Sequence, residues 1–333
     1  MNVGIIGYGY WGPNLVRNFS MVNDCTVKMV SDFRQERLAV VSKAYPTVTV
    51  TTDPDAILLS KEIDAVVIAT PVFTHFSLAK KALENGKHVL LEKPMTATVK
   101  EAEELMTLAK QKNLLLMVDH TFLYTGAIKK MKQLIDEKTM GDIHYFDSSR
   151  INLGLFQPDV NVLWDLAPHD ISMLLYLVKG KPYSVNATGI SHTKNGIENI
   201  AYLTVNYSND FIAHFSCSWT SPVKLRTLLI GGDKKMLLFN DLEPTEKIKI
   251  YDTGYNYKTD EEKKQLLVDY RTGDVFIPKL NTSEALLGMA TDFVSSIQNK
   301  TEPLSTASLG LEVIKILEAS QASIKNNGKE IIL

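Results

Sequence analysis

Two short motifs in this 333-residue chain contain titratable side chains at spacings that suggest acid–base chemistry. Asp165 and His169 are four residues apart, so a helix through them sets a carboxylate beside an imidazole, a common acid–base arrangement. Lys93, in Glu92-Lys93-Pro94, follows an apolar run. A lysine at the end of a buried strand is costly unless it meets a partner or an opening, where it can bind a reacting oxygen or pass a proton. We therefore predict that Lys93, Asp165 and His169 are catalytic.

Each of these three residues also has a purely structural interpretation. Pro168 suits a first helical turn, so we expect a helix from there to Val178, with Asp165 as its N-cap. His169 would then be a surface or satisfied core histidine, and Lys93 would extend to solvent beside Glu92. No independent carboxylate–histidine cluster completes a coordination set, so we predict no metal.

A glycine motif opens the chain directly behind an apolar run. Gly7, Gly9 and Gly12 form G-x-G-x-x-G, the fingerprint of dinucleotide binding. Gly7 would allow a positive φ, Gly9 would let a pyrophosphate approach, and Gly12 would let the next helix lie close. The free amides at the start of that helix would bind the phosphates.

An acidic residue stands at the distance that the fingerprint requires. Asp32 ends a predicted strand over 27–32, where a carboxylate binds the ribose diol and repels a 2′-phosphate. This position favours NAD. Arg34 could pair with such a phosphate, so NADP remains possible, and Asp32 could also cap a helix over 34–45.

The elements around these motifs alternate between strand and helix. We predict strands at 65–70, 88–92 and 114–118, and helices at 76–85 and 98–112. Such repeats imply a doubly wound parallel sheet, the Rossmann arrangement, which binds ligands at its carboxyl edge. Thr70-Pro71 lies there, either as a plain loop or as a wall beside the nicotinamide, and His75 lies near a helix start. The predicted cofactor contacts are Gly7, Gly9, Tyr10, Trp11, Gly12, Asp32, Arg34, Thr70, Pro71, His75, Glu92 and Lys93.

The second part of the chain has a different pattern. We end the dinucleotide-binding domain at residue 122 and assign 123–333 to an α/β domain for substrate binding and oligomerisation. Successive alternating segments predict an open, mostly antiparallel sheet, with strands at 143–151, 184–192, 201–207, 212–219, 226–230, 235–239 and 247–251. The charge run 260–264 is interpreted as a solvated loop. His120 and Tyr124 lie at the domain junction. The predicted substrate contacts are Lys93, His120, Tyr124, Asp165 and His169.

The composition limits the classes of partner. The chain is 45% hydrophobic and 22% charged with a net charge of −2, so neither nucleic acid nor an acidic membrane surface is an obvious partner. No apolar run is long enough for a membrane span, and the N-terminus lacks the basic region of a signal peptide. Two distant cysteines are consistent with a reducing compartment. We expect a cytoplasmic enzyme with a small-molecule substrate.

The motifs together resemble the Gfo/Idh/MocA oxidoreductases, named for glucose–fructose oxidoreductase, inositol dehydrogenase and rhizopine-catabolism relatives. The resemblance covers nearly the whole chain. It rests on the glycine motif, on Ala69-Thr70-Pro71 with His75, on the run from Gly86 to Pro94, on Asp165-x-x-x-His169-Asp170, and on Glu302-Pro303-Leu304.

The resemblance implies an activity and a role for each residue. It implies hydride transfer between a nicotinamide and a hydroxyl or keto carbon of a sugar, nucleotide-sugar or cyclitol. Lys93 would polarise or protonate the reacting oxygen, His169 would be the acid–base residue, and Asp165 would orient it or bind substrate. The second sheet would mediate assembly into a homodimer or homotetramer. Relatives that act at C3 of nucleotide-linked sugars are nearest in pattern.

The chain departs from the family pattern in two segments on the substrate side. Residues 121–124, Thr-Phe-Leu-Tyr, replace Arg-aromatic-x-Pro, and residues 161–164, Asn-Val-Leu-Trp, replace a glycine-rich lead-in. Two other functions stay open. One is a catalytically silent NAD-binding regulatory protein, and the other is an NAD-dependent glycosidase-type enzyme with a transient keto intermediate.

Overall fold

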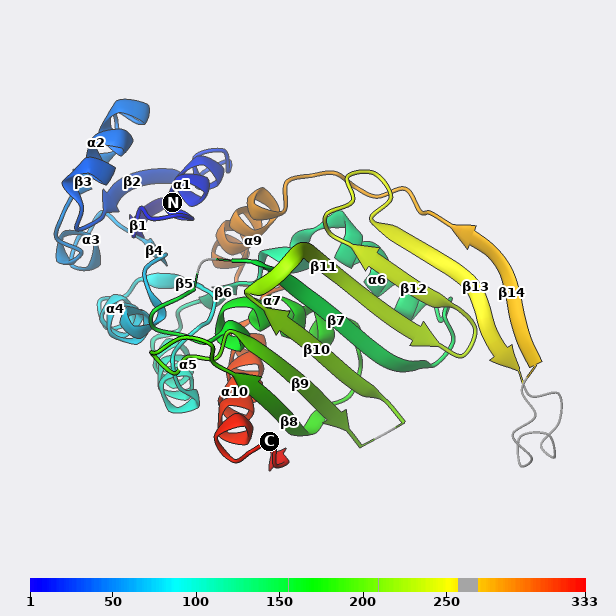
Figure 1. The fold of residues 1–333 in the computed structure, drawn as a ribbon. Coiled ribbons are helices and arrows are strands. Elements are labelled where there is room, and N and C mark those ends of the chain that lie inside the picture. Colours follow the sequence, from blue (N-terminus) through cyan, green and yellow to red (C-terminus); the bar gives the residue numbers. More distant parts are fainter. Residues whose placement is uncertain (155, 209, 257–268) are drawn as a thin grey trace. The chain divides into compact units, whose positions relative to one another are not determined.

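The chain divides into two compact units, each with its own sheet (Figure 1). The computed structural model describes residues 1–154, 156–208, 210–256 and 269–333. The first unit comprises Met1–Thr125 and Ser283–Lys315, and the second comprises Gly126–Thr282 and Ile316–Leu333. The predicted charged loop at 260–264 lies outside the described residues. The chain thus returns to its first unit at Ser283–Lys315. The predicted division into domains 1–122 and 123–333 has a single boundary, and it remains a proposal.

The first unit contains a six-stranded parallel sheet in the order β3-β2-β1-β4-β5-β6. This order confirms the predicted doubly wound Rossmann sheet. Apolar strands such as β4 are buried throughout, as parallel strands covered on both faces must be. The strands are β1 (Asn2–Ile6), β2 (Thr26–Ser31), β3 (Thr49–Thr51), β4 (Ala65–Ile68), β5 (His88–Glu92) and β6 (Leu116–Asp119).

Helices connect these strands and extend the first unit. They are α1 (Gly12–Phe19), α2 (Gln35–Ala44), α3 (Asp55–Leu58), α4 (Val72–Glu84), α5 (Val99–Lys112), the 3₁₀ helix η1 (Thr121–Tyr124), α9 (Ala285–Asn299) and the first half of α10 (Ala307–Lys325). Thr98 caps α5, because its side chain accepts a hydrogen bond from the amide of Glu101. Phe19 and Phe293 meet edge to face at 6.1 Å between ring centroids, which packs α9 on α1.

The second unit contains a nine-stranded sheet in the order β14-β13-β12-β11-β7-β10-β9-β8-β15. Every neighbouring pair is antiparallel except β7 with β10, which confirms the mostly antiparallel prediction. The strands are β7 (Ile143–Leu153), β8 (Pro182–Ile190), β9 (Ile200–Tyr207), β10 (Ile212–Ser218), β11 (Thr220–Gly232), β12 (Met236–Asn240), β13 (Ile248–Asn256), β14 (Asp269–Phe276) and β15 (Ile331–Ile332).

Helices α6 (Gly126–Asp136) and α7 (Val162–Leu177) lie on one side of this sheet (Figure 1). The strands alternate accordingly: Leu203 and Ala213 are fully buried, whereas their neighbours Tyr202 and Ile212 are half exposed. The sheet is therefore open on its other face within this unit, as predicted. Among the described helices of both units, none has the length and apolar character needed to cross a bilayer.

Candidate functional site

The glycine loop between β1 and α1 has the shape that a dinucleotide requires. Gly7 has a φ of +100°, and a Cβ there would lie 2.4 Å from the carbonyl oxygen of Ala69, the residue that follows the neighbouring strand β4. A Cβ on Gly12 would lie 2.6 Å from the carbonyl oxygen of Gly7. At Gly9 the nearest atom is an Arg34 side-chain nitrogen at 3.7 Å, so this position has room for a phosphate. Tyr10, 87% exposed, and Trp11 flank the loop as an edge-to-face pair.

Asp32, just after β2, is held beside this loop. Its carboxylate accepts hydrogen bonds from the amide of Tyr8 at 2.7 Å, from the amide of Arg34 at 3.0 Å, and from the Arg34 guanidinium twice at 2.9 Å. Burial acts to raise the pKa of Asp32, but the hydrogen bonds from Arg34 and Tyr8 lower it overall. The alternative that Asp32 caps a helix by its side chain is wrong, because α2 begins at Gln35 with Arg34 as N-cap. The Asp32 carboxylate is therefore ionised and paired with the guanidinium of Arg34.

His75 joins two further strand ends at the same edge of the first sheet. It lies in the first turn of α4, which begins at Val72, earlier than the predicted residue 76. Its Nε2 lies 2.8 Å from the carbonyl oxygen of Thr70, and its Nδ1 lies 3.0 Å from that of Pro94. Burial lowers the pKa of His75 despite these two carbonyl contacts. His75 thus links the loop after β4 to the loop after β5, where the peptide bond between Lys93 and Pro94 is cis.

Lys93 follows β5 at this carboxyl edge, half buried. Glu92, predicted to contact the cofactor, is buried and lies opposite Asp119 in the register of β5 and β6. Their side chains hydrogen-bond each other. Sequence reasoning also placed Asp119, next to His120, at the carboxyl ends of the strands, but it assigned Asp119 no role.

His120 and Tyr124 flank the end of β6 in different ways. His120 is 1% exposed, and neither ring nitrogen has a hydrogen-bond partner among the described residues. Burial, with a smaller effect of the Lys93 charge, lowers the pKa of His120 to about 3, so its ring is neutral. The Tyr124 hydroxyl donates to Asp292 at 2.7 Å and accepts from the amide of Ser305 at 3.2 Å, tying η1 to the C-terminal part of the first unit.

Asp165 and His169 lie in the second unit, one turn apart on α7. The prediction that this helix starts at Pro168 is wrong, because α7 begins at Val162 and encloses the proline. Asn161 is the N-cap and accepts from the amide of Trp164 at 3.1 Å, so Asp165 is not the cap either.

The two acidic residues around His169 have firm partners. Asp165 accepts a hydrogen bond at 3.0 Å from the indole nitrogen of Trp219, a buried residue next to β11. Asp170 forms a bidentate ion pair with Arg150 of β7 at 2.7 and 2.8 Å, and both side chains are at most 5% exposed. Sequence reasoning missed Trp219 and Arg150, because no local pattern marks a residue whose partner lies 20 or more positions away.

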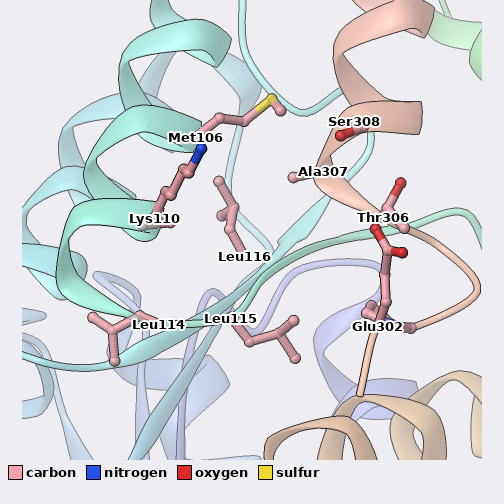
Figure 2. Close-up of a pocket in the computed structure, with 11 residues that line it drawn as sticks. Met106, Lys110, Leu114, Leu115, Leu116, Glu302, Thr306, Ala307 and Ser308 are labelled. Atoms are coloured by element: carbon pink, nitrogen blue, oxygen red, sulfur yellow. The ribbon is translucent and has the colours of Figure 1, made fainter. Parts of the chain in front are cut away.

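The structure therefore brings most predicted cofactor residues to one edge. β1, β4 and β5 are neighbours, so the loops that follow them lie side by side, and His75 ties the second to the third. A separate pocket of about 220 Å³ lies between α5 and the start of α10 (Figure 2). Its wall includes Leu114 to Leu116, at the amino end of β6, so it is not at this edge.

The fold and the loop define the class of protein, a Rossmann-fold protein with a dinucleotide-binding glycine loop. A model of an oxidoreductase family with an NAD-binding Rossmann fold matches residues 1–120, and the GFO/IDH/MocA C-terminal domain matches residues 128–238. The chain belongs to the Gfo/Idh/MocA family. This confirms the predicted family and the NAD-type cofactor.

Several known proteins are similar to this chain in sequence or in structure. The oxidoreductase YdgJ of Escherichia coli K12 is 34% identical over 205 residues, which are 56% of this chain and 55% of YdgJ. UDP-N-acetylglucosamine 3-dehydrogenase of Acidithiobacillus ferrooxidans is 31% identical over 227 residues, 66% of this chain and 67% of that protein. The chain thus spans between half and two thirds of these relatives. The solved structure of GnnA, the A. ferrooxidans enzyme, has a TM-score of 0.81 at 23% identity and 98% coverage of both chains, which confirms the fold.

Proposed function

We propose that this protein transfers a hydride between a nicotinamide and a hydroxyl or keto carbon of a sugar, nucleotide-sugar or cyclitol. The observation that carries this proposal is the shared carboxyl edge of β1, β4 and β5. That edge holds the glycine loop, Thr70-Pro71 and Lys93, so a dinucleotide on the loop would run toward the lysine. The proposed cofactor contacts are those predicted from the sequence, with His75 acting through the two loops it links.

The proposed reaction divides its proton chemistry between two residues. When bound, the nicotinamide supplies or accepts the hydride. His169 accepts the hydroxyl proton of the substrate as the carbon is oxidised and returns it in the reverse direction. Asp165, on the same helix face, stabilises the resulting imidazolium and is itself held by Trp219. Lys93 donates a hydrogen bond to the reacting oxygen and stabilises its developing negative charge.

His120 and Tyr124 complete the proposed substrate contacts. The two ring nitrogens of His120 lack protein partners among the described residues, and a neutral imidazole offers one donor and one acceptor to a polar ligand. Tyr124 already uses its proton on Asp292, so its contribution would be an acceptor or a ring contact.

NAD is the proposed cofactor rather than NADP. The ionised Asp32 would repel a 2′-phosphate, and the guanidinium of Arg34 is already bound to that carboxylate. NADP use would require Arg34 to leave Asp32. Relative binding of the two dinucleotides to the purified protein, measured by calorimetry, decides between them.

A nucleotide-linked sugar is the proposed substrate. The support is the likeness to UDP-N-acetylglucosamine 3-dehydrogenase, which acts on such a molecule. A cyclitol or a free sugar is the next choice, since the family takes its name partly from inositol dehydrogenase.

We also propose that the open face of the second sheet joins copies into a homodimer or homotetramer in the cytoplasm. Tyr202, Ile212 and Leu229 lie on this face and are each 44–50% exposed. Leu229→Arg should dissociate the oligomer in light-scattering measurements; an unchanged mass would refute this interface. The free state of both cysteines is consistent with a reducing compartment.

The activity is tested with purified protein, NAD⁺, and a panel of UDP-N-acetylglucosamine, myo-inositol and glucose. We expect reduced cofactor to accumulate with one of them, as measured by its absorbance. Tight NAD⁺ binding without reduction by any would favour the regulatory protein. Glycoside cleavage without net reduction would favour the glycosidase-type enzyme.

A further inference from the structure

A pair of buried carboxyl groups stands beside Lys93 at the carboxyl edge of the first sheet. Glu92 ends β5, Asp119 ends β6, and the two are register partners with exposures of 8% and 3%. Their side chains are hydrogen-bonded to each other. Ionised carboxylates only accept hydrogen bonds, so a bond between two of them requires a proton on one.

Each carboxyl of the pair also accepts a hydrogen bond from outside the pair. The Thr121 hydroxyl donates to Asp119 Oδ1, and the amide of Lys93 donates to Glu92 Oε2 at 3.2 Å. These donors favour the charged form of whichever carboxyl they serve. Burial and the charge of Asp119 raise the pKa of Glu92, and burial raises the pKa of Asp119. Burial and the hydrogen bond between the two carboxyl groups therefore favour a single shared proton on the pair.

Lys93 is the cation that acts on both members of the pair, because its charge opposes the rise in both pKa values. Of the other groups nearby, His120 is neutral and contributes no charge. Tyr124 is also neutral, because burial and its bond to Asp292 raise its pKa.

We propose that Glu92 and Asp119 form a one-proton acid pair that is the buried counter-ion of Lys93 and positions its ammonium. The proposal rests on the proposed function for the role of Lys93 at the reacting oxygen. Both members are positioning residues. The pair differs from a single carboxylate in one testable way: either member alone can carry the charge.

The first test is infrared spectroscopy of the protein without substrate or cofactor. We expect a C=O stretching band of a protonated carboxyl at neutral pH. In Glu92→Gln or Asp119→Asn, the remaining carboxyl loses its like-charged neighbour, ionises beside Lys93, and the band disappears from both variants. Glu103→Gln, at an exposed position of α5, is the matched control and should keep the band. No band in the wild type, or a band that persists in both single variants, would overturn the proposal.

The second test measures the reactivity of Lys93 with acetic anhydride, mapped by mass spectrometry of its peptide. Only an uncharged amine reacts. Each single variant keeps one negative charge, so labelling should stay within about twofold of the wild type. The double variant removes that charge, and labelling should rise clearly above this twofold range, since a nearby opposite charge favours the charged form of an amine. Labelling of the double variant at the wild-type rate would contradict the counter-ion role.

These readouts need neither turnover nor a known substrate. An inactive protein with the expected infrared and labelling results would refute the proposed function and leave the acid pair intact. If the double variant does not fold, as judged by circular dichroism, the infrared results of the single variants decide alone.

Discussion

The strand ends of the first unit and helix α7 of the second both carry acidic side chains, but the partners of these acids differ between the two regions. On α7 and its surroundings, Asp170 has a full ion pair with Arg150, and Asp165 has a hydrogen bond from Trp219. At the ends of β5 and β6, Glu92 and Asp119 are register partners, and the charge of Lys93 lowers the pKa of both against the effect of burial.

This difference separates fixed charges from a charge that can shift. A bidentate ion pair holds its geometry and stays ionised. Two facing carboxyl groups exchange a proton, so their charge adapts to what happens at the neighbouring lysine. We infer that α7 holds His169 next to acids with fixed partners. Lys93 of the first unit instead lies next to a negative charge that can shift between two carboxyl groups.

The largest expected effect is on catalysis. Lys93→Met and His169→Asn should each lower kcat by about 10²–10⁴-fold, because each removes a group that acts on the reacting oxygen. For His169→Asn, which is not among the proposed cofactor contacts, the dinucleotide affinity measured by calorimetry should change little. Lys100→Met and His144→Asn are the matched controls. Normal turnover in either active-site variant would remove that residue from the mechanism.

The next effect concerns stability and compares the two regions directly. Arg150→Met leaves the Asp170 charge buried without its cation and should lower the free energy of unfolding by about 3–5 kcal/mol. Glu92→Gln keeps a hydrogen bond to Asp119 and should cost less than about 1.5 kcal/mol. Urea denaturation measures both, and equal losses would show that the two acids are held alike.

The pH dependence of stability should also differ between acids. The pKa of Glu92 is raised above 4.5 in the folded protein, so its contribution is full below that pH and is lost as the pH rises. The stability of the wild type relative to Glu92→Gln should therefore fall as the pH rises above 4.5, by at most about 1.4 kcal/mol per pH unit.

Asp32, whose pKa is lowered from 3.8, should show the opposite sign. Its contribution is present above that pH and is lost on acidification, so the wild type should weaken relative to Asp32→Asn as the pH falls below 4. The same slope in both variants would contradict the comparison.

The smallest effect concerns cofactor choice at Asp32, an acid of the first unit with its own cation. Asp32→Ser removes the charge that would repel a 2′-phosphate and frees Arg34 to bind it. The ratio of NADP to NAD affinity should rise by about tenfold, or about 1.4 kcal/mol. An unchanged ratio would show that this pair does not select the cofactor.

Local signals in the sequence predicted much of this structure. The glycine loop, the apolar strands and the capped helix α5 each depend on residues close together in the chain, so their patterns are readable. The start of α7 was mispredicted because a proline at position 168 is tolerated inside the helix while Asn161 caps it. The Trp219 and Arg150 contacts depend on which strands lie next to α7, and no local pattern encodes that. The predicted catalytic roles stay predictions.

The account depends most on one convergence: the ammonium of Lys93 and the imidazole of His169 should act on the same oxygen. A crystal structure of the protein with NAD⁺ and UDP-N-acetylglucosamine, or the substrate that the activity panel identifies, measures this directly. We predict that Lys93 Nζ and a ring nitrogen of His169 both lie about 3 Å from one substrate hydroxyl. Two groups on opposite sides of the ligand, or separated by packed side chains, would contradict the account.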